Sequence, residues 1–354
     1  MCIRDSHTDA TYDSVILHIT SDADIDVHRT NGDPIPQLIL TCPDYVCRNY
    51  HELVETESYP PCYRIIPTLS IFTIHSWMSA LQLERFEQKA SQLSERLKRC
   101  NSNWEDAFFI TLARNFGFGL NGDAFETWAN RIPLRAVDKH RDELFQIEAF
   151  FFGQAGLLQG TAGDEYYLRL KKEYEYLSHK FGLTPMDVSQ WRFLRLRPTN
   201  FPHIRIAQLA VLYHRSYGLL SRIMEAETVT KVHEILKGGT SAYWVNHYTF
   251  EHPSPSRPKT LSNSSLDLLI INTVATFLYS YGVHKGKEEY CARAGAFLEE
   301  LKAEYNYITR MWEQCGIKAA NASDSQALIQ LKKEYCDKKK CLYCRIGYEY
   351  LKRN

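Results

Sequence analysis

Four arginines are concentrated between Trp191 and Leu209, in a stretch that contains no acidic residue. They are Arg192, Arg195, Arg197 and Arg205. Guanidinium groups this close in sequence repel one another unless an anion or a carboxylate neutralises them. Because a guanidinium is a rigid bidentate donor, it suits phosphate oxygens, including those of a nucleic-acid backbone. The stretch therefore predicts a binding site for nucleic acid or another phosphorylated partner, and Asn200 is included among its candidate residues.

Two prolines, Pro198 and Pro202, frame a short irregular turn, because the residue before a proline is disfavoured in the α region. Pro202 then suits the first turn of a helix that follows it. If the segment before the turn is extended, Arg195 and Arg197 share one face and Arg192 lies on the other.

The competing interpretation is that these arginines pair with carboxylates inside the protein. Asp142 and Glu148 are candidate partners, and Asn200 would then only close the turn. Structural ion pairs are commoner than binding sites, which favours this alternative. The two interpretations differ in whether the arginines converge on an open concave surface or are buried against acids.

A second candidate site lies near the C-terminus, where Cys336, Cys341 and Cys344 follow a Cys-x4-Cys-x2-Cys spacing. Thiolates spaced in this way can share a Zn²⁺ ion or an iron–sulfur cluster, and Cys315 is a candidate fourth ligand. We expect zinc first and the cluster as the alternative. Tetrahedral coordination with Zn–S bonds of about 2.3 Å would bring the three sulfur atoms within about 4 Å of one another. Otherwise the cysteines are reduced and pack a C-terminal cap.

His7, Asp9 and His18 form a weaker third group at the start of the chain. Together with a segment that precedes them in related proteins, they could complete a carboxylate–histidine site. A histidine in a strand is usually an ordinary polar position, which is the alternative here.

Composition limits the classes of function. The 354 residues include 42 Lys+Arg and 42 Asp+Glu, so the formal net charge is zero and binding to a polyanion must depend on local patches. One such patch is the C-terminal stretch 330–354, with eight basic residues and three acidic ones. No run of about eighteen apolar residues and no signal peptide is visible, so we expect no membrane span, a cytoplasmic location and reduced cysteines.

Periodicity predicts a mainly α protein with a small N-terminal β remnant, α+β overall. Strands are expected over 13–20, with burial, and over 36–40, returning from an Asn31–Gly32 hairpin turn. After the connector that ends at Pro67 the apolar spacing is helical. We expect residues 1–66 to form the β remnant and connector, with 1–6 resembling a non-native leader, and 67–354 to form a helical domain carrying the cysteines.

Several longer motifs indicate a family resemblance. They are Leu112–Gly117, Lys139–Asp142, Phe152–Leu157, Leu196–Pro202, Asp324–Leu328 and Cys341–Cys344. Together they resemble the domain-of-unknown-function family 2851, found chiefly in Bacteroidetes, over nearly the whole chain from His7 onward. The resemblance implies no activity, since the family has none assigned. Intact relatives carry an additional N-terminal segment with a Gly-Asp-Val-Glu-Ile-His-type strand, which this sequence lacks.

Three hypotheses of function follow, and whether the chain is an enzyme stays open. The first is binding of nucleic acid or another phosphorylated partner through the arginine stretch and the basic C-terminus. The second is a structural or protein-interaction module with internally paired arginines. The third is a fragment of a metal-dependent nuclease-like enzyme whose active segment is missing, prompted by the acid-and-histidine strand.

Overall fold

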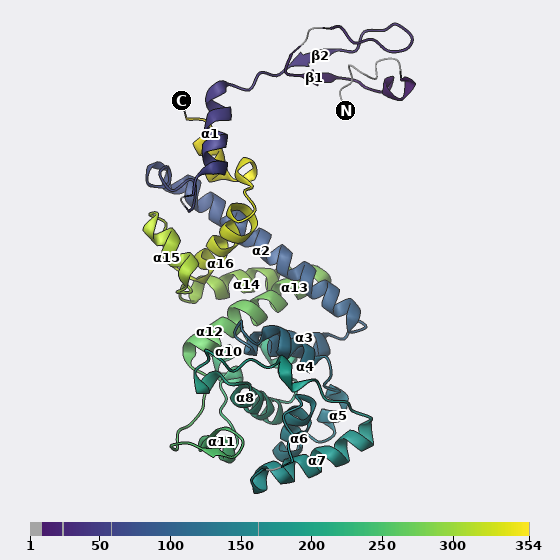
Figure 1. The fold of residues 1–354 in the computed structure, drawn as a ribbon, viewed down its shortest axis with the longest axis vertical. Coiled ribbons are helices and arrows are strands. Elements are labelled where there is room, and N and C mark those ends of the chain that lie inside the picture. The colour runs from purple at the N-terminus through teal and green to yellow at the C-terminus, as the bar shows by residue number, and fades with distance from the viewer. Residues whose placement is uncertain (1–8, 23–24, 58, 162, 354) are drawn as a thin grey trace. The chain divides into compact units, whose positions relative to one another are not determined.

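The computed structural model describes residues 9–22, 25–57, 59–161 and 163–353, so His7 lies outside the described residues. Helices dominate (Figure 1), and the strands of this part of the chain form two small two-stranded sheets. The prediction of a mainly α chain with small β elements near the N-terminus is confirmed.

The chain divides into two compact units. Unit 1 comprises residues 1–77, 310–317 and 331–354, and unit 2 comprises residues 78–309 and 318–330. We expected a single division after residue 66. The C-terminal segments instead belong with the N-terminal part. A single boundary along the sequence cannot describe a unit that combines both ends of the chain.

The sheet of unit 1 is smaller and more exposed than expected. β1 (His18–Thr20) and β2 (Gln37–Ile39) pair in parallel, and the predicted turn is present between them, with His28 bridged to Pro34 in the antiparallel sense. Ile19 is 56% exposed, so the prediction of a buried strand here is wrong. Two strands with no covering layer in the described residues cannot bury an apolar face.

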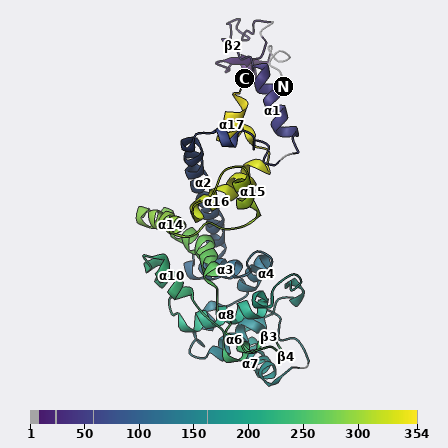
Figure 2. The ribbon, with the colours of Figure 1, turned by 90° about the vertical axis from the view of Figure 1, so that its left-hand side faces the viewer.

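The helical part of unit 1 joins the two ends of the chain. α1 (Asp44–Glu55) packs against α17 (Arg345–Leu351), as Figures 1 and 2 show. The Asn49 side-chain amide donates hydrogen bonds to the carbonyl oxygens of Leu351, at 3.2 Å, and Arg353, at 2.7 Å. The Leu351 carbonyl is in the last turn of α17, where carbonyls lack a partner within the helix, so Asn49 caps the end of α17.

Unit 2 is built from helices and one short hairpin. Two helices contain a boundary between the units, α2 (Ile71–Arg99) and α15 (Tyr307–Gln314). The other elements are α3 (Trp104–Phe116), α4 (Gly122–Ala129), α5 (Leu134–Asp138), α6 (Leu144–Gln154), α7 (Glu165–Phe181), α8 (Pro202–Arg215), α9 (Leu219–Glu225), α10 (Val229–Leu236), α11 (Ala242–Val245), β3 (His247–Thr249), β4 (His252–Pro253), α12 (Asn263–Leu269), α13 (Ala275–Lys285), α14 (Glu288–Glu300) and α16 (Ala322–Gln330).

Local signals fix several of these helix ends. Asn103 caps α3 by accepting from the backbone N–H groups of Glu105 and Asp106, and Asp164 caps α7 through Tyr167 N–H at 2.8 Å. α6 and α8 contact each other in the core, where aromatic rings such as Phe151 are completely buried. The order of the helices thus follows the sequence pattern, whereas their packing depends on the aromatic core.

A long apolar helix runs over residues 263–285, formed by α12, a π-helical turn and α13. By length and composition alone it could cross a membrane, and 67% of its most apolar window is buried inside the protein. Ser262 is the N-cap residue of this helix.

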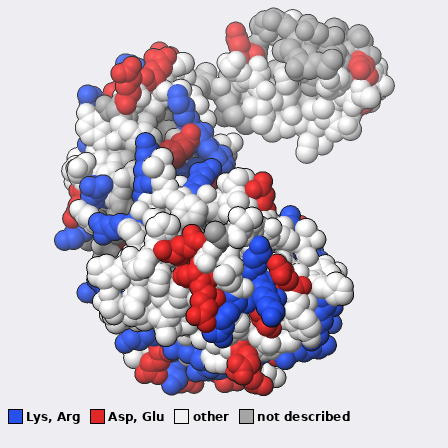
Figure 3. Space-filling view, turned by 60° about the horizontal axis from the view of Figure 1, so that its bottom comes forward, with Lys and Arg blue, Asp and Glu red and all other residues white. Residues whose placement is uncertain are grey.

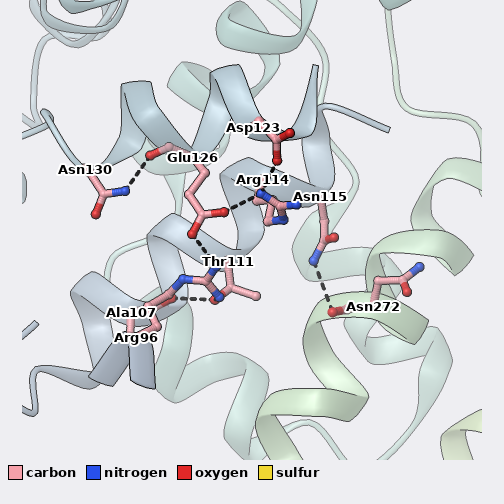
Figure 4. A network of polar contacts seen from close by, with 9 residues as sticks. All are labelled: Arg96, Ala107, Thr111, Arg114, Asn115, Asp123, Glu126, Asn130 and Asn272. Carbon is pink, nitrogen blue, oxygen red and sulfur yellow. Dashed lines mark hydrogen bonds and ion pairs between the residues drawn. The ribbon is translucent and has the colours of Figure 1, made fainter. Parts of the chain in front are cut away.

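An ion-pair network ties α2, α3 and α4 together (Figure 4). Glu126 accepts hydrogen bonds from Arg96, at 2.6 Å, and from Arg114. Arg96 also donates to the Thr111 hydroxyl at 2.9 Å, and Arg114 reaches Asp123 at 2.7 Å. The Arg96 and Glu126 side chains are only 12% and 18% exposed, so each charge needs the other.

We expect Glu126→Gln to lower the free energy of unfolding by about 2–3 kcal/mol, because it leaves the nearly buried Arg96 without a countercharge. Glu234→Gln is the matched control, since the Lys231–Glu234 pair is more than half exposed and its loss should change stability by less than about 0.5 kcal/mol. Urea denaturation of both variants measures this. Equal effects would show that the network contributes nothing beyond a surface pair.

Candidate functional site

Helix α8 places a charged residue inside the protein. Pro202 occupies its first turn, as predicted, and Pro202–Ala210 are all buried. Arg205 lies in this buried run and is 6% exposed. A helix buried on nearly all sides cannot extend an arginine into bulk solvent along its own surface, so the neighbours of Arg205 must accommodate the charge.

Those neighbours are neutral. The Arg205 guanidinium donates to the Gln208 side chain at 2.9 Å and to the Asn200 side chain at 2.6 Å, and it lies 4.3 Å from the ring centroid of Phe118. Its Nε is buried without a partner. Within the described residues no carboxylate forms an ion pair with it. Burial lowers the pKa of Arg205 to about 10, so the group still carries its charge at neutral pH.

The guanidinium lines a cavity of about 320 Å³, which we call the Arg205 cavity. Its lining contains three cationic residues and no acidic one. The polar lining residues are Thr199, Asn200, Arg205, Gln208, Arg257, Lys259, Thr260, Ser262 and Ser265. Three cations facing one cavity without an acid give it a positive potential that low-dielectric walls concentrate.

The second cation, Lys259, is 3% exposed. Its ammonium donates to the Val245 carbonyl at 2.7 Å and lies 4.3 Å from the Tyr248 ring centroid. Burial, and then the neighbouring charge of Arg257, lower the pKa of Lys259. Gln208 links Arg205 to the segment that carries Lys259, because its amide also donates to the Lys259 backbone carbonyl at 3.0 Å.

Hydroxyl groups and a helix start complete the lining. Ser262 accepts from the Ser265 backbone N–H at 3.2 Å as the N-cap of α12, and the two hydroxyl oxygens are 3.0 Å apart. α12 begins the helix over 263–285, so the positive end of that helix dipole faces the same region. The arrangement offers donors and positive charge together, which suits an anion with several oxygens.

The structure divides the predicted arginine site. Asn200 and Arg205 meet in the Arg205 cavity, whereas Arg192, Arg195 and Arg197 are exposed and do not line it. An extended segment would have placed Arg195 and Arg197 on one face, but this condition is not met. Arg195 has a φ of 65° in a turn, so the backbone is not extended there.

Two anchors explain this turn. The Trp191 indole donates to the Ala155 carbonyl at 2.8 Å, and the Asn121 side chain bonds both backbone groups of Arg192 at 2.8 Å. Within the described residues, neither Asp142 nor Glu148 pairs with the arginines of this stretch. The internal ion-pair alternative with these two acids is therefore wrong.

Sequence reasoning missed the other half of the cavity. Arg257 and Lys259 come from the end of the proline-bearing segment 253–259, and Ser262 is the cap of the following helix. The available signal was the Arg-Pro-Lys run directly before a serine-rich helix start. This run lies about fifty residues after Arg205 in the sequence, so its spacing gave no indication that the two line one cavity.

A larger cavity of about 520 Å³ is lined by residues of α3 and α5 and the segments beside them. Both signs of charge occur there, since Asp106 and Arg135 both line it; burial raises the pKa of Asp106, and the nearby charge of Arg135 opposes that rise. Its charges thus partly neutralise one another. On the face drawn in Figure 3, basic and acidic side chains are likewise interspersed. The Arg205 cavity differs from this larger one because all of its charged lining residues are cationic.

Glu148 is a buried carboxyl in unit 2 that is 1% exposed. Tyr166 and Ser241 donate hydrogen bonds to it, the latter at 2.8 Å. Burial raises the pKa of Glu148 to about 7, although both hydroxyls favour the charged form. In the described structure it has no cationic partner, so ionisation at alkaline pH costs stability.

The predicted cysteine ligands are also partly brought together. Cys336, Cys341 and Cys344 line one cavity of unit 1, but Cys62 lines it with them and Cys315 does not. No three His, Cys, Asp or Glu side chains of the described residues are close enough to hold one metal ion. The Zn²⁺ ion or iron–sulfur cluster expected at these cysteines stays a prediction. At the N-terminus, Asp9 caps a short 3-10 turn through Thr11 N–H, and His18 begins β1.

Comparison with known proteins gives one match. A family model described as "Protein of unknown function (DUF2851)" matches residues 4–307. No curated protein and no solved structure matches the chain.

The raised pKa of Glu148 predicts a pH-dependent stability. Between about pH 4.5 and 7 the folded state binds this proton more tightly than the unfolded state does, so stability falls as pH rises through that window. Glu148→Gln should therefore be more stable than the wild type at pH 8, by on the order of 2 kcal/mol, and similar at pH 4. Urea denaturation at both pH values tests this, with the exposed Glu175→Gln as control. A variant with the wild-type pH profile would refute it.

Proposed function

Because this chain belongs to the DUF2851 family, whose description assigns no function, we propose a function from the site itself: the protein binds a phosphorylated ligand in the Arg205 cavity. The observation that carries the proposal is a buried guanidinium with neutral neighbours and an unpartnered Nε, facing a cavity lined by two more cations.

The cost of burying this charge supports an anionic ligand. An ion removed from water loses several kcal/mol of solvation, which a protein normally recovers through a countercharge. Asn200 and Gln208 supply hydrogen bonds to Arg205 but no charge. A bound anion would supply the missing countercharge, so the cavity is expected to be more stable occupied than empty.

Phosphate is the anion that fits the donor set best. A guanidinium can give two parallel hydrogen bonds to two phosphate oxygens, and Lys259 adds a compact positive charge. The hydroxyls of Ser262 and Ser265 and the helix start behind them suit the remaining oxygen. A carboxylate would use only part of this set.

The size of the cavity indicates the kind of ligand. About 320 Å³ lies at the lower end of the range of small-molecule pockets. It admits a phosphate group with a small organic part, or one terminal phosphate of a longer molecule. The walls are largely polar rather than apolar, so recognition would rest on the phosphate rather than on a large hydrophobic body.

A second candidate, single-stranded nucleic acid, is favoured by one further observation. Arg192, Arg195 and Arg197 are exposed, lack ion pairs within the described structure, and precede the turn that carries Thr199 and Asn200 into the cavity lining. A strand with its terminal phosphate in the cavity could place further phosphates against these arginines.

Arg205→Met tests the first proposal. In the wild type, pyrophosphate should bind measurably by calorimetry and raise the midpoint of thermal unfolding. The variant should bind at least about 10–100-fold more weakly, because a charge-assisted hydrogen-bonding group is lost. Without ligand its stability should be unchanged or higher, since an unpaired buried charge has been replaced by an apolar group.

Arg222→Gln serves as the control, because this exposed arginine lies outside the cavity lining and its loss should leave pyrophosphate binding intact. Wild-type protein that binds neither phosphate nor pyrophosphate would contradict the proposal. A large loss of stability in ligand-free Arg205→Met would instead assign the arginine a structural role.

A triple Gln variant at Arg192, Arg195 and Arg197 separates the second candidate from the first. If single-stranded nucleic acid binds, this variant should lower the slope of log affinity against log salt concentration by about 2–3, while pyrophosphate binding stays unchanged. Fluorescence anisotropy with a short 5′-phosphorylated oligonucleotide measures the slope. An unchanged slope would remove these arginines from the interface.

A further inference from the structure

Four cysteines of unit 1 line one small cavity, and we call them the four-cysteine set: Cys62, Cys336, Cys341 and Cys344. They come from two ends of the sequence. The first lies in the connector after α1, and the others lie in the C-terminal segment before α17. Cys62 and Cys344 are buried, and the other two are partly buried.

The backbone around the C-terminal three is tightly organised. The Lys340 N–H donates to the Tyr335 carbonyl at 2.8 Å and closes the loop between Cys336 and Cys341. Cys344 begins α17, where its carbonyl accepts from the Tyr348 N–H at 2.8 Å.

Gly347 lets α17 approach this loop. A Cβ built on Gly347 would stand 2.1 Å from the Cys341 carbonyl oxygen, so a larger residue does not fit there. The glycine thus holds the helix against the backbone of one member of the four-cysteine set.

The surroundings of the thiols also distinguish the set. Four buried or partly buried thiols that line one cavity gain little from hydrogen bonding, because S–H is a weak donor and sulfur a weak acceptor. A metal centre would make use of all four sulfurs as thiolates.

Spacing and geometry favour a cluster over a single ion. The Cys-x4-Cys-x2-Cys run with a fourth cysteine elsewhere is the ligand spacing of plant-type iron–sulfur ferredoxins. Zinc would require sulfur atoms about 3.8 Å apart, as its bond length and tetrahedral geometry dictate. Among the described residues, no group of three or more His, Cys, Asp or Glu side chains is arranged to hold a single metal ion. In a cluster the cysteines bind different iron atoms, so the sulfurs stand farther apart.

We propose that the four-cysteine set holds an iron–sulfur cluster, with Cys62 in the place that the sequence assigned to Cys315. The cluster fastens the connector after α1 to the C-terminal segment, close to where Asn49 caps α17. A centre whose ligands come together only in the folded state stabilises that state, so we assign it a structural role. This proposal concerns unit 1 and is independent of the Arg205 cavity.

The test begins with the full chain purified without oxygen and without chelator. Iron and acid-labile sulfide should be present in equal amounts, with the visible absorption of sulfur-to-iron charge transfer. Elemental analysis covers zinc in the same samples. Metal-free protein would overturn the proposal, and so would one zinc per chain without iron, because it would assign the thiols to a single ion.

Cys62→Ser should lose most of the iron and sulfide, whereas Cys315→Ser should retain them and serves as the matched control. Full iron content in Cys62→Ser would overturn the assignment of this residue. Circular dichroism checks folding, and a second measurement needs no variant: chelation of iron from the wild type should lower the midpoint of thermal unfolding by roughly 5 °C or more. An unchanged midpoint would overturn the structural role.

Discussion

The burial of helix α8 is the constraint on which the candidate site depends. Once Pro202–Ala210 are enclosed by the core of unit 2, every polar group on that helix must find its partners locally. Arg205 finds Asn200 before the helix and Gln208 one turn later, and Gln208 in turn bonds the loop that carries Lys259. The cavity, its charge and its amide groups all follow from placing one cation on a buried helix.

Unit 2 treats its buried charges in two different ways. Arg96 is neutralised by Glu126 in a network that joins three helices, so its burial is accounted for by an internal ion pair. Arg205 and Glu148 are each buried in the same unit without an opposite charge. Glu148 is bonded by the Tyr166 and Ser241 hydroxyls, and Arg205 by the Asn200 and Gln208 side chains. An unpaired buried charge costs stability, and binding of a ligand is a reason for a protein to keep one.

Unit 1 depends on contacts between the two ends of the chain. A connector, a two-stranded sheet and short helices give it little apolar area, and small units commonly need a cross-link or a metal for stability. The Asn49 cap on α17 is one such link. The four thiols around a common cavity are a second place where the two ends meet.

The sequence by itself determined the mainly α fold, because helical periodicity and capping residues such as Asn103 and Asp164 act over a few neighbouring residues. It also placed Arg205 and Asn200 in one candidate set of five residues, since all five lie within a short stretch around a proline turn. The sequence did not predict the exposure of β1, because an apolar strand pattern does not indicate whether a second layer covers the strand.

Only the tertiary structure decided which charges meet. It brought Arg257 and Lys259 to Arg205, moved three neighbouring arginines to the surface, and set Cys62 rather than Cys315 beside the C-terminal cysteines. Each of these contacts joins segments distant in sequence. Residue spacing reports such contacts only when a regular element connects the two partners, whereas here loops and helix packing connect them.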